Sequence, residues 1–527
     1  MIPTPAPAFD PAAWWAAVDG ARTAVIDTGA ERAVSYAELH ADAERWRACL
    51  RRHGVRPGDR IAVLAHNRYE FLPLFVACLR VGAVLVPLNW RLTTIELGRV
   101  LQHAEPVLLF AESRFVHHRS AATMTRWLDL DLDLDRDLDA EAVAPPSAPP
   151  VAPMSGAQDR REHGLAMLLY TSGTTGAPKG VMVSHRQLVW NAVSTILGWS
   201  LCRDDVAAIA TPLFHTAAWH VFATPLLYCG GCVVVLPDFD PSTWFAQLER
   251  HGVTRVFCVP TQLHRLRQAP DFGRPLPALR TFISGGAPLP PHLAATMRGA
   301  GYTVRDAYGL TECGPNCFVI TDSVLAEKPW SVGTPLPFLR MRVMDAHGIA
   351  VPPGGIGELQ LEGPQLFDGY FRDAPSTLAA MTSDGWLRSG DLVTVDDEGH
   401  YRLRGRVKDL FISGGENVYP GEVEATLAAC DGVQSVAVVG VPDETWGEVG
   451  CAFVVPARDG VRTEDLLREA RRGLAGYKVP RLVVWVEALP LLGNGKVDRA
   501  ALRSLASQTT HGEDWGMSAS TRPQPLP

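Results

Sequence analysis

Residues 59–87, DRIAVLAHNRYEFLPLFVACLRVGAVLVP, decide the fold class of this 527-residue chain. The apolar runs at 61–65 and 83–87 are typical of buried strands, and residues 67–82 between them carry a helical spacing of apolar side chains. A strand, a helix and a second strand in close succession indicate two parallel strands joined by a crossover helix. The stretch therefore predicts a layered α/β fold.

The same rhythm recurs along the chain. It appears in residues 206–237 (VAAIAT, a helical pattern, then CVVVLP) and again in residues 255–286 (RVFCVP, a polar helix, then LRTFISGG). Residues 128–156 interrupt it with an Asp-Leu alternation followed by a Pro/Ala run. The alternation fits one amphipathic strand or an acidic calcium strip, but calcium loops need glycine turns and a bidentate carboxylate, which are missing here. A solvated linker or variable edge is the favoured interpretation.

The pattern changes near residue 405. A basic segment, GRVKD, precedes strand and helix patterns at 435–442, 451–457 and 463–474. About 100 residues suit a small second domain, and the polar, Pro-containing stretch after Ser504 is typical of a disordered tail. We therefore expect a large N-terminal domain over 1–405, a small α+β domain over 406–505 and a disordered tail over 506–527.

Composition narrows the function. The chain is 47% hydrophobic and 20% charged, as in ordinary globular proteins. A net charge of −8 gives no reason to expect nucleic acid as a partner. No apolar run reaches the roughly 18 residues of a membrane span, and the start, MIPTPAPAFD, does not resemble a signal peptide. We expect a cytoplasmic protein.

Ten cysteines fit reduced thiols in that compartment. The pairs Cys229/Cys232 and Cys313/Cys317 have a spacing seen in zinc sites, but the two pairs lie far apart in the chain. Buried free thiols are the expected state.

The loop YTSGTTGAPKG, residues 170–180, carries the first sign of chemistry. Its glycines allow the backbone to approach a ligand closely, and its free N–H groups favour an anion such as a polyphosphate. The common phosphate loop, G-x-x-x-x-G-K-[ST], does not match: Lys179 follows Pro178, and Gly180 takes the place of the metal-binding hydroxyl. The sequence predicts a phosphate loop of another type.

Four further segments follow this loop along the chain: ISGGAPL (283–289), YGLTECGP (308–315), SGD (389–391) and LGNGKVDRA (492–500). With these motifs in this order, the chain resembles the adenylate-forming acyl-CoA synthetases, which include luciferases and peptide-synthetase adenylation domains. The resemblance extends from about Ser35 to Leu502. Each motif alone could be a solvent-exposed linker, a turn or a chance tripeptide, so their order carries the argument.

The resemblance implies an ATP site. In the family, the residue matching Thr311 contacts the α-phosphate, the one matching Glu312 holds Mg²⁺, and the one matching Tyr308 stacks on adenine. The residue matching Asp391 binds the ribose hydroxyls. The ATP-binding residues implied in this way are Thr171, Ser172, Gly173, Thr174, Thr175, Gly176, Lys179, Gly285, Gly286, Ala287, Tyr308, Gly309, Thr311, Asp391, Arg406 and Lys496.

The same resemblance assigns catalytic roles to Lys496, Thr311 and Glu312. Lys496 matches a lysine that reaches both the attacking carboxylate and the α-phosphate while the acyl-adenylate forms. The small domain then rotates about a hinge that matches Lys408.

Segment 412–424, ISGGENVYPGEVE, matches the loop that builds a tunnel for CoA pantetheine, with Gly414, Gly415 and Glu416 along it. Mg²⁺ is thus the expected cofactor, with ATP and CoA as co-substrates.

The acyl substrate is suggested by PLFHTAAWH, residues 212–220, which matches the lining of the acyl pocket. Amino-acid-activating relatives carry an Asp where this chain has His215, so a simple carboxylic acid, and in particular a fatty acid, is expected. Trp219 matches a tryptophan that gates the tunnel in some long-chain relatives, although a plain core role is equally compatible.

The sequence thus predicts an ATP-dependent acyl-CoA synthetase of the fatty-acid–CoA ligase type. Two alternatives stay open: a ligase that loads an acyl or aryl acid onto the pantetheine of a carrier protein, and an inactive nucleotide-binding relative. Oligomeric state is left open.

Overall fold

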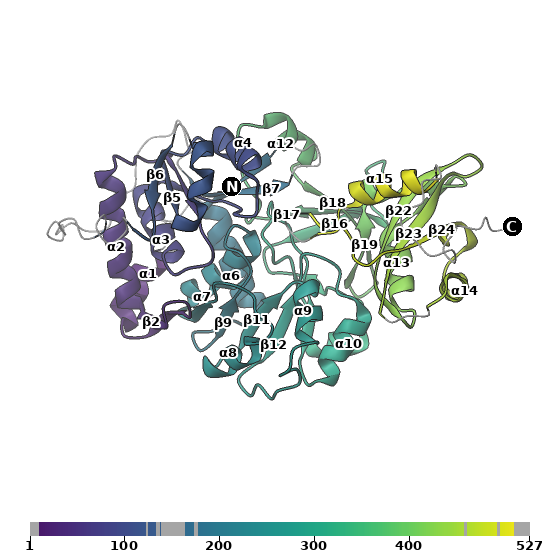
Figure 1. The fold of residues 1–527 in the computed structure, drawn as a ribbon, viewed down its shortest axis with the longest axis horizontal. Coiled ribbons are helices and arrows are strands. Elements are labelled where there is room, and N and C mark those ends of the chain that lie inside the picture. Colours follow the sequence, from purple (N-terminus) through teal and green to yellow (C-terminus); the bar gives the residue numbers. More distant parts are fainter. Residues whose placement is uncertain are drawn as a thin grey trace.

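The computed structural model describes residues 10–122, 125–132, 138, 164–172, 178–457, 461–492 and 496–510. A large N-terminal domain of layered sheets and helices is followed by a small C-terminal domain, which lies at the right in Figure 1. The predicted α/β fold class is confirmed.

One large sheet carries the strands that precede the predicted nucleotide motifs. Its strands are parallel except for β2, which runs antiparallel to β1. In order across the sheet they are β13 (Val304–Asp306), β12 (Thr281–Ser284), β11 (Arg255–Cys258), β9 (Val206–Ile209), β10 (Cys232–Val235), β1 (Thr23–Asp27) and β2 (Arg32–Ser35). The carboxyl ends of β12 and β13 lead directly into ISGGAPL and YGLTECGP.

A second large sheet contains the strand–helix–strand unit predicted from residues 59–87. There β3 and β4 are parallel, and helix α3 (Phe71–Val81) joins them. The helix begins at Phe71 rather than Asn67, and it ends at Gly82, whose left-handed backbone (φ 74°) suits glycine. Across the sheet the strands are β6 (Arg126–Asp129), β5 (Leu108–Ala111), β3 (Arg60–Leu64), β4 (Val84–Pro87), β7 (Leu165–Ser172) and β8 (Pro178–Ser184).

Helices cover these sheets and enclose the main core. Trp46, Trp219 and Phe222 are among its largest fully buried side chains. Besides α3, the helices described in the large domain are α1 (Pro11–Asp19), α2 (Tyr36–Arg52), α4 (Thr94–Ala104), η1 (Ser113–Ala122), α6 (His185–Trp199), the π-helix η2 (Ala218–Ala223), α7 (Thr224–Cys229), α8 (Trp244–Arg250), α9 (Pro260–Leu266), α10 (Pro291–Gly299), α11 (Asp322–Glu327) and α12 (Ala374–Ala380).

An antiparallel sheet completes the large domain and lies on the side of the small domain (Figure 1). Its order is β16 (Arg340–Met344), β17 (Gly357–Glu362), β18 (Leu387–Val395) and β19 (Tyr401–Arg406). A short pair, β14 (Phe318–Val319) with β15 (Thr334–Pro335), forms a two-stranded sheet of its own. The SGD motif lies on β18, and Asp391 there is directly opposite Arg406 on β19.

The small domain has hydrophobic clusters of its own, built around Phe411, Val438 and Phe453. Its strands follow the order β21, β20, β23, β22, with β24 paired to β23. The elements are η3 (Val407–Asp409), β20 (Phe411–Ser413), β21 (Glu416–Val418), α13 (Pro420–Ala428), β22 (Val433–Asp443), β23 (Gly447–Pro456), α14 (Thr463–Gly473), η4 (Gly476–Lys478), β24 (Leu482–Trp485) and α15 (Arg499–Thr510).

The structure bears on the predictions for two irregular segments, residues 128–156 and residues 506–527. The first residues of the Asp-Leu alternation form the end of edge strand β6 and the turn after it, where Leu128 and Leu130 are buried. Most of residues 133–156 lies outside the described residues. The prediction of disorder from residue 506 is wrong for residues 506–510, because α15 continues to Thr510. Leu502 and Ala506, one helical turn apart, are buried against the small sheet.

The predictions about cysteines, metal sites and membrane spans can also be compared with the structure. All ten cysteines lie within the described residues and are free thiols. Across those residues no group of three His, Cys, Asp or Glu side chains could hold a metal ion. In the parts of the chain that the structure describes, no helix combines the length and apolar character needed to cross a membrane.

Candidate active site

Asp391 is the anchor of the predicted ribose site. Its carboxylate is buried and accepts a hydrogen bond from the Tyr308 hydroxyl at 2.6 Å. The Arg406 guanidinium forms an ion pair with the other carboxylate oxygen, with Nε and Oδ1 2.8 Å apart. Burial, reinforced by Asp391, raises the pKa of Tyr308 well above its ordinary value, so the phenol remains a donor. The fold therefore joins residues from YGLTE, SGD and GRVKD at one point.

The predicted adenine segments meet beside this point. Strands β12 and β13 pair Ser284 with Asp306, which brings ISGGAPL next to YGLTECGP. Gly286 has a left-handed backbone (φ 83°), and an added Cβ at Gly285 would come 3.1 Å from the carbonyl oxygen of Ala307. Ala287 follows directly. These contacts require small residues where the two segments meet.

Asp306 is a polar residue that sequence reasoning did not assign. Its Oδ1 atom is buried and has no hydrogen-bond partner in the structure. Burial raises the pKa of Asp306 to about 7, against the opposing effect of backbone N–H groups at Leu289 and Ala307. No local pattern distinguishes this aspartate from a surface one.

The phosphate loop is framed by the antiparallel pair of β7 and β8. The register sets Thr171 opposite Lys179, and Ser172 opposite Pro178. Predicted loop residues Gly173, Thr174, Thr175 and Gly176 lie outside the described residues. Lys179 donates from Nζ to the Ser376 hydroxyl at 3.0 Å, and the same Nζ lies 5.1 Å from the centre of the Tyr370 ring.

Glu312 and Thr311 follow β13 in a tightly packed turn. A Cβ at Gly309 would collide with the backbone of Pro315, so only glycine fits that position. The side-chain amide of Gln187 donates to the carbonyl oxygen of Thr311 at 3.0 Å. Glu312 receives a hydrogen bond from the Tyr370 hydroxyl at 2.7 Å, a contact that sequence reasoning missed.

Glu312 fits the predicted Mg²⁺ site. One carboxylate oxygen is held by Tyr370, and the described residues supply no cage of further protein ligands. Mg²⁺ is commonly held by one or two carboxylates together with substrate phosphate oxygens and water. The donor set therefore suits an ion that arrives with the nucleotide.

Lys496 of the small domain interacts electrostatically with residues of the large domain. Burial of its ammonium group lowers its pKa, as do Arg406 and Lys408, while Asp391 and Glu312 act in the opposite sense. These interactions link the lysine to two of the predicted nucleotide residues.

Lys408, the predicted hinge, is exposed in η3 between the last strand of the large domain and the first strand of the small one. That position connects the two domains through a short exposed turn.

His215 and Trp219 differ in their surroundings. Burial, together with Arg91 and Lys496, lowers the pKa of His215 to about 4, so the imidazole is neutral at pH 7. Its ring centroid lies 4.5 Å from that of Phe214. Trp219 is fully buried, donates from Nε1 to the carbonyl oxygen of Leu213 and packs 5.0 Å from Phe75. These are the contacts of a core residue.

Gly414 and Gly415 form the turn between β20 and β21 in the small domain, and Glu416 is the first residue of β21. The two glycines have left-handed backbones (φ 60° and 86°), and a Cβ at Gly414 would come 2.5 Å from the Trp446 ring. Within the described residues, an added Cβ at Gly415 would meet nothing within 4 Å. One side of this turn is thus packed and the other open.

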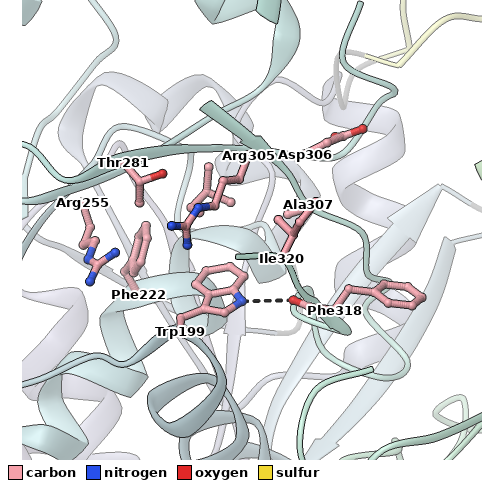
Figure 2. A pocket seen from close by; sticks show the side chains of 10 residues that line it. Trp199, Phe222, Arg255, Thr281, Arg305, Asp306, Ala307, Phe318 and Ile320 are labelled. Carbon is pink, nitrogen blue, oxygen red and sulfur yellow. Dashed lines mark hydrogen bonds between the residues drawn. The ribbon is translucent and has the colours of Figure 1, made fainter. Parts of the chain in front are cut away.

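A hollow next to the adenine segments is drawn in Figure 2. Trp199 donates to the carbonyl oxygen of Phe318 across it at 3.0 Å, and the guanidinium groups of Arg255 and Arg305 line it. Its free volume is about 10 Å³, which is enough for about one water molecule. The hollow is too small to be the acyl pocket.

These motifs, together with the arrangement of the two domains, can be compared with known proteins. A family model described as AMP-binding enzyme matches residues 12–371. The chain belongs to this family. A second model, AMP-binding enzyme C-terminal domain, matches residues 422–496, which carry Lys496 at their end.

Relatives of this AMP-binding enzyme are acid–CoA ligases. Feruloyl-CoA synthase from an Amycolatopsis species is 40% identical over 486 residues, covering 89% of this chain and 94% of the relative. Long-chain-fatty-acid–CoA ligase FadD13 from Mycobacterium tuberculosis is 33% identical over 500 residues, covering 92% of this chain and 96% of the relative.

Among solved structures, ATP-bound MatB from Rhodopseudomonas palustris has a TM-score of 0.84 and 33% identity, with 94% of this chain and 98% of that chain covered. The predicted family is confirmed. The comparisons support an ATP-dependent acyl-CoA ligase whose acid they leave unspecified.

Replacing Asp391 by alanine is expected to weaken ATP binding more than it slows chemistry. The buried carboxylate contacts Tyr308 and Arg406 and would accept the ribose hydroxyls, so its loss would affect nucleotide binding away from the reacting phosphorus. Loss of a charged hydrogen-bond acceptor costs about 1.5–3 kcal/mol, so the KM for ATP should rise about tenfold or more. Steady-state kinetics at varied ATP measure this; an unchanged KM would remove Asp391 from the ribose site.

Proposed function

We propose that this protein is an AMP-forming acid–CoA ligase that activates an aromatic carboxylic acid as its acyl-adenylate. The observation that carries the proposal is the contact of the buried Asp391 carboxylate with Tyr308 and Arg406, together with the electrostatic interaction of Lys496 with Asp391 and Glu312. The charge requirements of adenylation match this set of side chains.

In the first half-reaction the acid carboxylate attacks the α-phosphorus of ATP, and pyrophosphate leaves. Lys496 would approach both reacting groups with its positive charge, and Thr311 would contact the α-phosphate. Lys179 would bind the outgoing phosphates. Mg²⁺ held by Glu312 would neutralise phosphate charge. Fixed charges of this kind stabilise the transition state because they need no reorganisation when negative charge develops.

In the second half-reaction the CoA thiol attacks the acyl carbonyl, and AMP leaves. The CoA thiol and the Lys496 side chain would compete for the same space near the acyl-adenylate. We therefore propose that residues 406–505 rotate about Lys408 and present Gly414, Gly415 and Glu416 to the pantetheine of CoA. Separate hydrophobic clusters on either side of residue 405 support a boundary there. The pantetheine of a carrier protein is the alternative acceptor.

The acid is the finer part of the proposal. A neutral His215 offers no negative partner for a substrate amino group, which favours an acid without one. Trp219 and Phe222 are fully buried in the segment next to His215, and this filled core favours a compact acid over a long chain. The relative of 40% identity is named for feruloyl-CoA. A fatty acid, the expectation from sequence, becomes the second candidate, supported by the likeness to FadD13.

Thioester formation with a panel of acids tests this assignment. We expect the highest kcat/KM with hydroxycinnamic acids such as ferulate, lower values with long-chain fatty acids and no turnover with amino acids. A single assay of CoA thioester formation, run at fixed ATP and CoA, compares all of them. Higher kcat/KM with palmitate than with any aromatic acid would contradict the aromatic assignment, and preference for an amino acid would contradict the role of His215.

A further inference from the structure

Tyr370 connects two parts of the site that the motifs leave separate. Its hydroxyl donates to Oε1 of Glu312 at 2.7 Å, and its ring lies 5.1 Å from Nζ of Lys179. The first contact fixes the orientation of a carboxylate, and the second holds a cation against the face of an aromatic ring. One side chain therefore contacts both the proposed metal carboxylate and the proposed phosphate-binding lysine.

The surrounding backbone holds Tyr370 firmly in this position. Its N–H donates to the Thr377 hydroxyl at 2.8 Å, and it forms an isolated antiparallel bridge with Val181, two residues beyond Lys179. Three residues earlier, the N–H of Phe367 donates to the carbonyl oxygen of Glu312 at 2.7 Å. The segment 367–370 is thus attached to both the Glu312 turn and strand β8.

We propose that Tyr370 is a positioning residue that aligns the Glu312 carboxylate for Mg²⁺ and keeps Lys179 directed at the outgoing phosphates. The inference deepens the proposed function and rests on its assignment of Glu312 to the metal. Because one oxygen of Glu312 is occupied by the tyrosine hydroxyl, the carboxylate presents its other oxygen in a fixed direction. Partners of this kind typically change metal affinity by about 10–100-fold when they are removed.

The two contacts can be separated by substitution. Tyr370→Phe removes the hydroxyl and leaves the ring beneath Lys179, whereas Tyr370→Leu removes both. Tyr302→Phe is the control: Tyr302 is a buried tyrosine whose hydroxyl donates to the carbonyl oxygen of Arg274, before strands β12 and β13 begin. Thermal unfolding of each variant establishes that it is folded.

The readout is nucleotide affinity rather than turnover. Calorimetry with a non-hydrolysable ATP analogue, with and without Mg²⁺, gives the factor by which the metal tightens binding. For Tyr370→Phe we expect that factor to fall about tenfold while metal-free affinity stays as in the unchanged protein. For Tyr370→Leu, metal-free affinity should fall as well, because Lys179 loses its aromatic support. Tyr302→Phe should alter neither quantity.

Three results would overturn the inference, and they can be told apart. If Glu312→Gln, measured in parallel, keeps the full effect of Mg²⁺, the metal assignment in the proposed function is wrong. If Glu312→Gln loses that effect and Tyr370→Phe keeps it, the metal assignment stands and Tyr370 does not position the carboxylate. A Tyr370→Phe variant that weakens binding equally with and without Mg²⁺ also contradicts the inference.

Discussion

Replacing Lys496 by alanine is expected to slow adenylation by about 10²–10³, the usual loss for one preorganised charged donor. Lys496 interacts electrostatically with Glu312 and Asp391 of the large domain, two of the residues that we propose hold ATP and its metal. It belongs, however, to the small domain, which we propose rotates away before CoA attacks. The lysine should therefore matter in only one half-reaction.

Supplying the acyl-adenylate directly tests this division. With pre-formed adenylate and CoA, Lys496→Ala should form thioester at a near-normal rate, measured by rapid quench. Lys328→Ala serves as the control, since Lys328 pairs with Asp396 at the opposite end of the β18–β19 hairpin from Asp391. Equal impairment of both half-reactions by Lys496→Ala would mean that the lysine is structural or that the domain does not alternate.

Replacing Glu312 by alanine is expected to abolish measurable ligation at ordinary Mg²⁺ concentrations. The substitution removes the carboxylate that we propose holds Mg²⁺, and it leaves the Tyr370 hydroxyl without its acceptor. An unsatisfied polar group costs about 1–3 kcal/mol. Loss of the metal lowers the stabilisation of the transition state by several kcal/mol more. Product formation should fall by more than about 10³-fold.

A carboxylate elsewhere provides the comparison. Glu362→Ala on β17 breaks an ion pair with Arg340 at the edge of the antiparallel sheet and should leave activity unchanged. High Mg²⁺ should restore Glu312→Ala only partly, because the phosphates alone bind the ion weakly. Activity of Glu312→Ala close to that of Glu362→Ala would exclude the metal role.

Local pattern predicted much of the fold. Apolar runs such as residues 61–65 and 83–87 became parallel strands because strands buried on both faces need continuous apolar sequence. The change of pattern near residue 405 corresponds to separate hydrophobic clusters. Helix α15 was missed at its end, since two buried side chains, Leu502 and Ala506, hold an otherwise polar stretch in a helix.

The site was predictable where resemblance supplied an ordered motif, and it was hidden elsewhere. Asp391, Arg406 and Tyr308 meet as the motif order implies. Tyr370 was not found because its contacts to Glu312 and Lys179 arise from strand pairing across a long stretch of chain. The burial of the Asp306 carboxylate and of Trp219 depends on packing between segments that are distant in sequence.

ATP–pyrophosphate exchange without CoA tests the central claim most directly, because the claim is that an acyl-adenylate forms before the thiol is needed. Labelled pyrophosphate should enter ATP only when an acid substrate such as ferulate is present, and addition of CoA should then yield AMP and thioester in equal amounts. Thioester formation without any acid-dependent exchange in the absence of CoA, or release of ADP in place of AMP, would contradict the account.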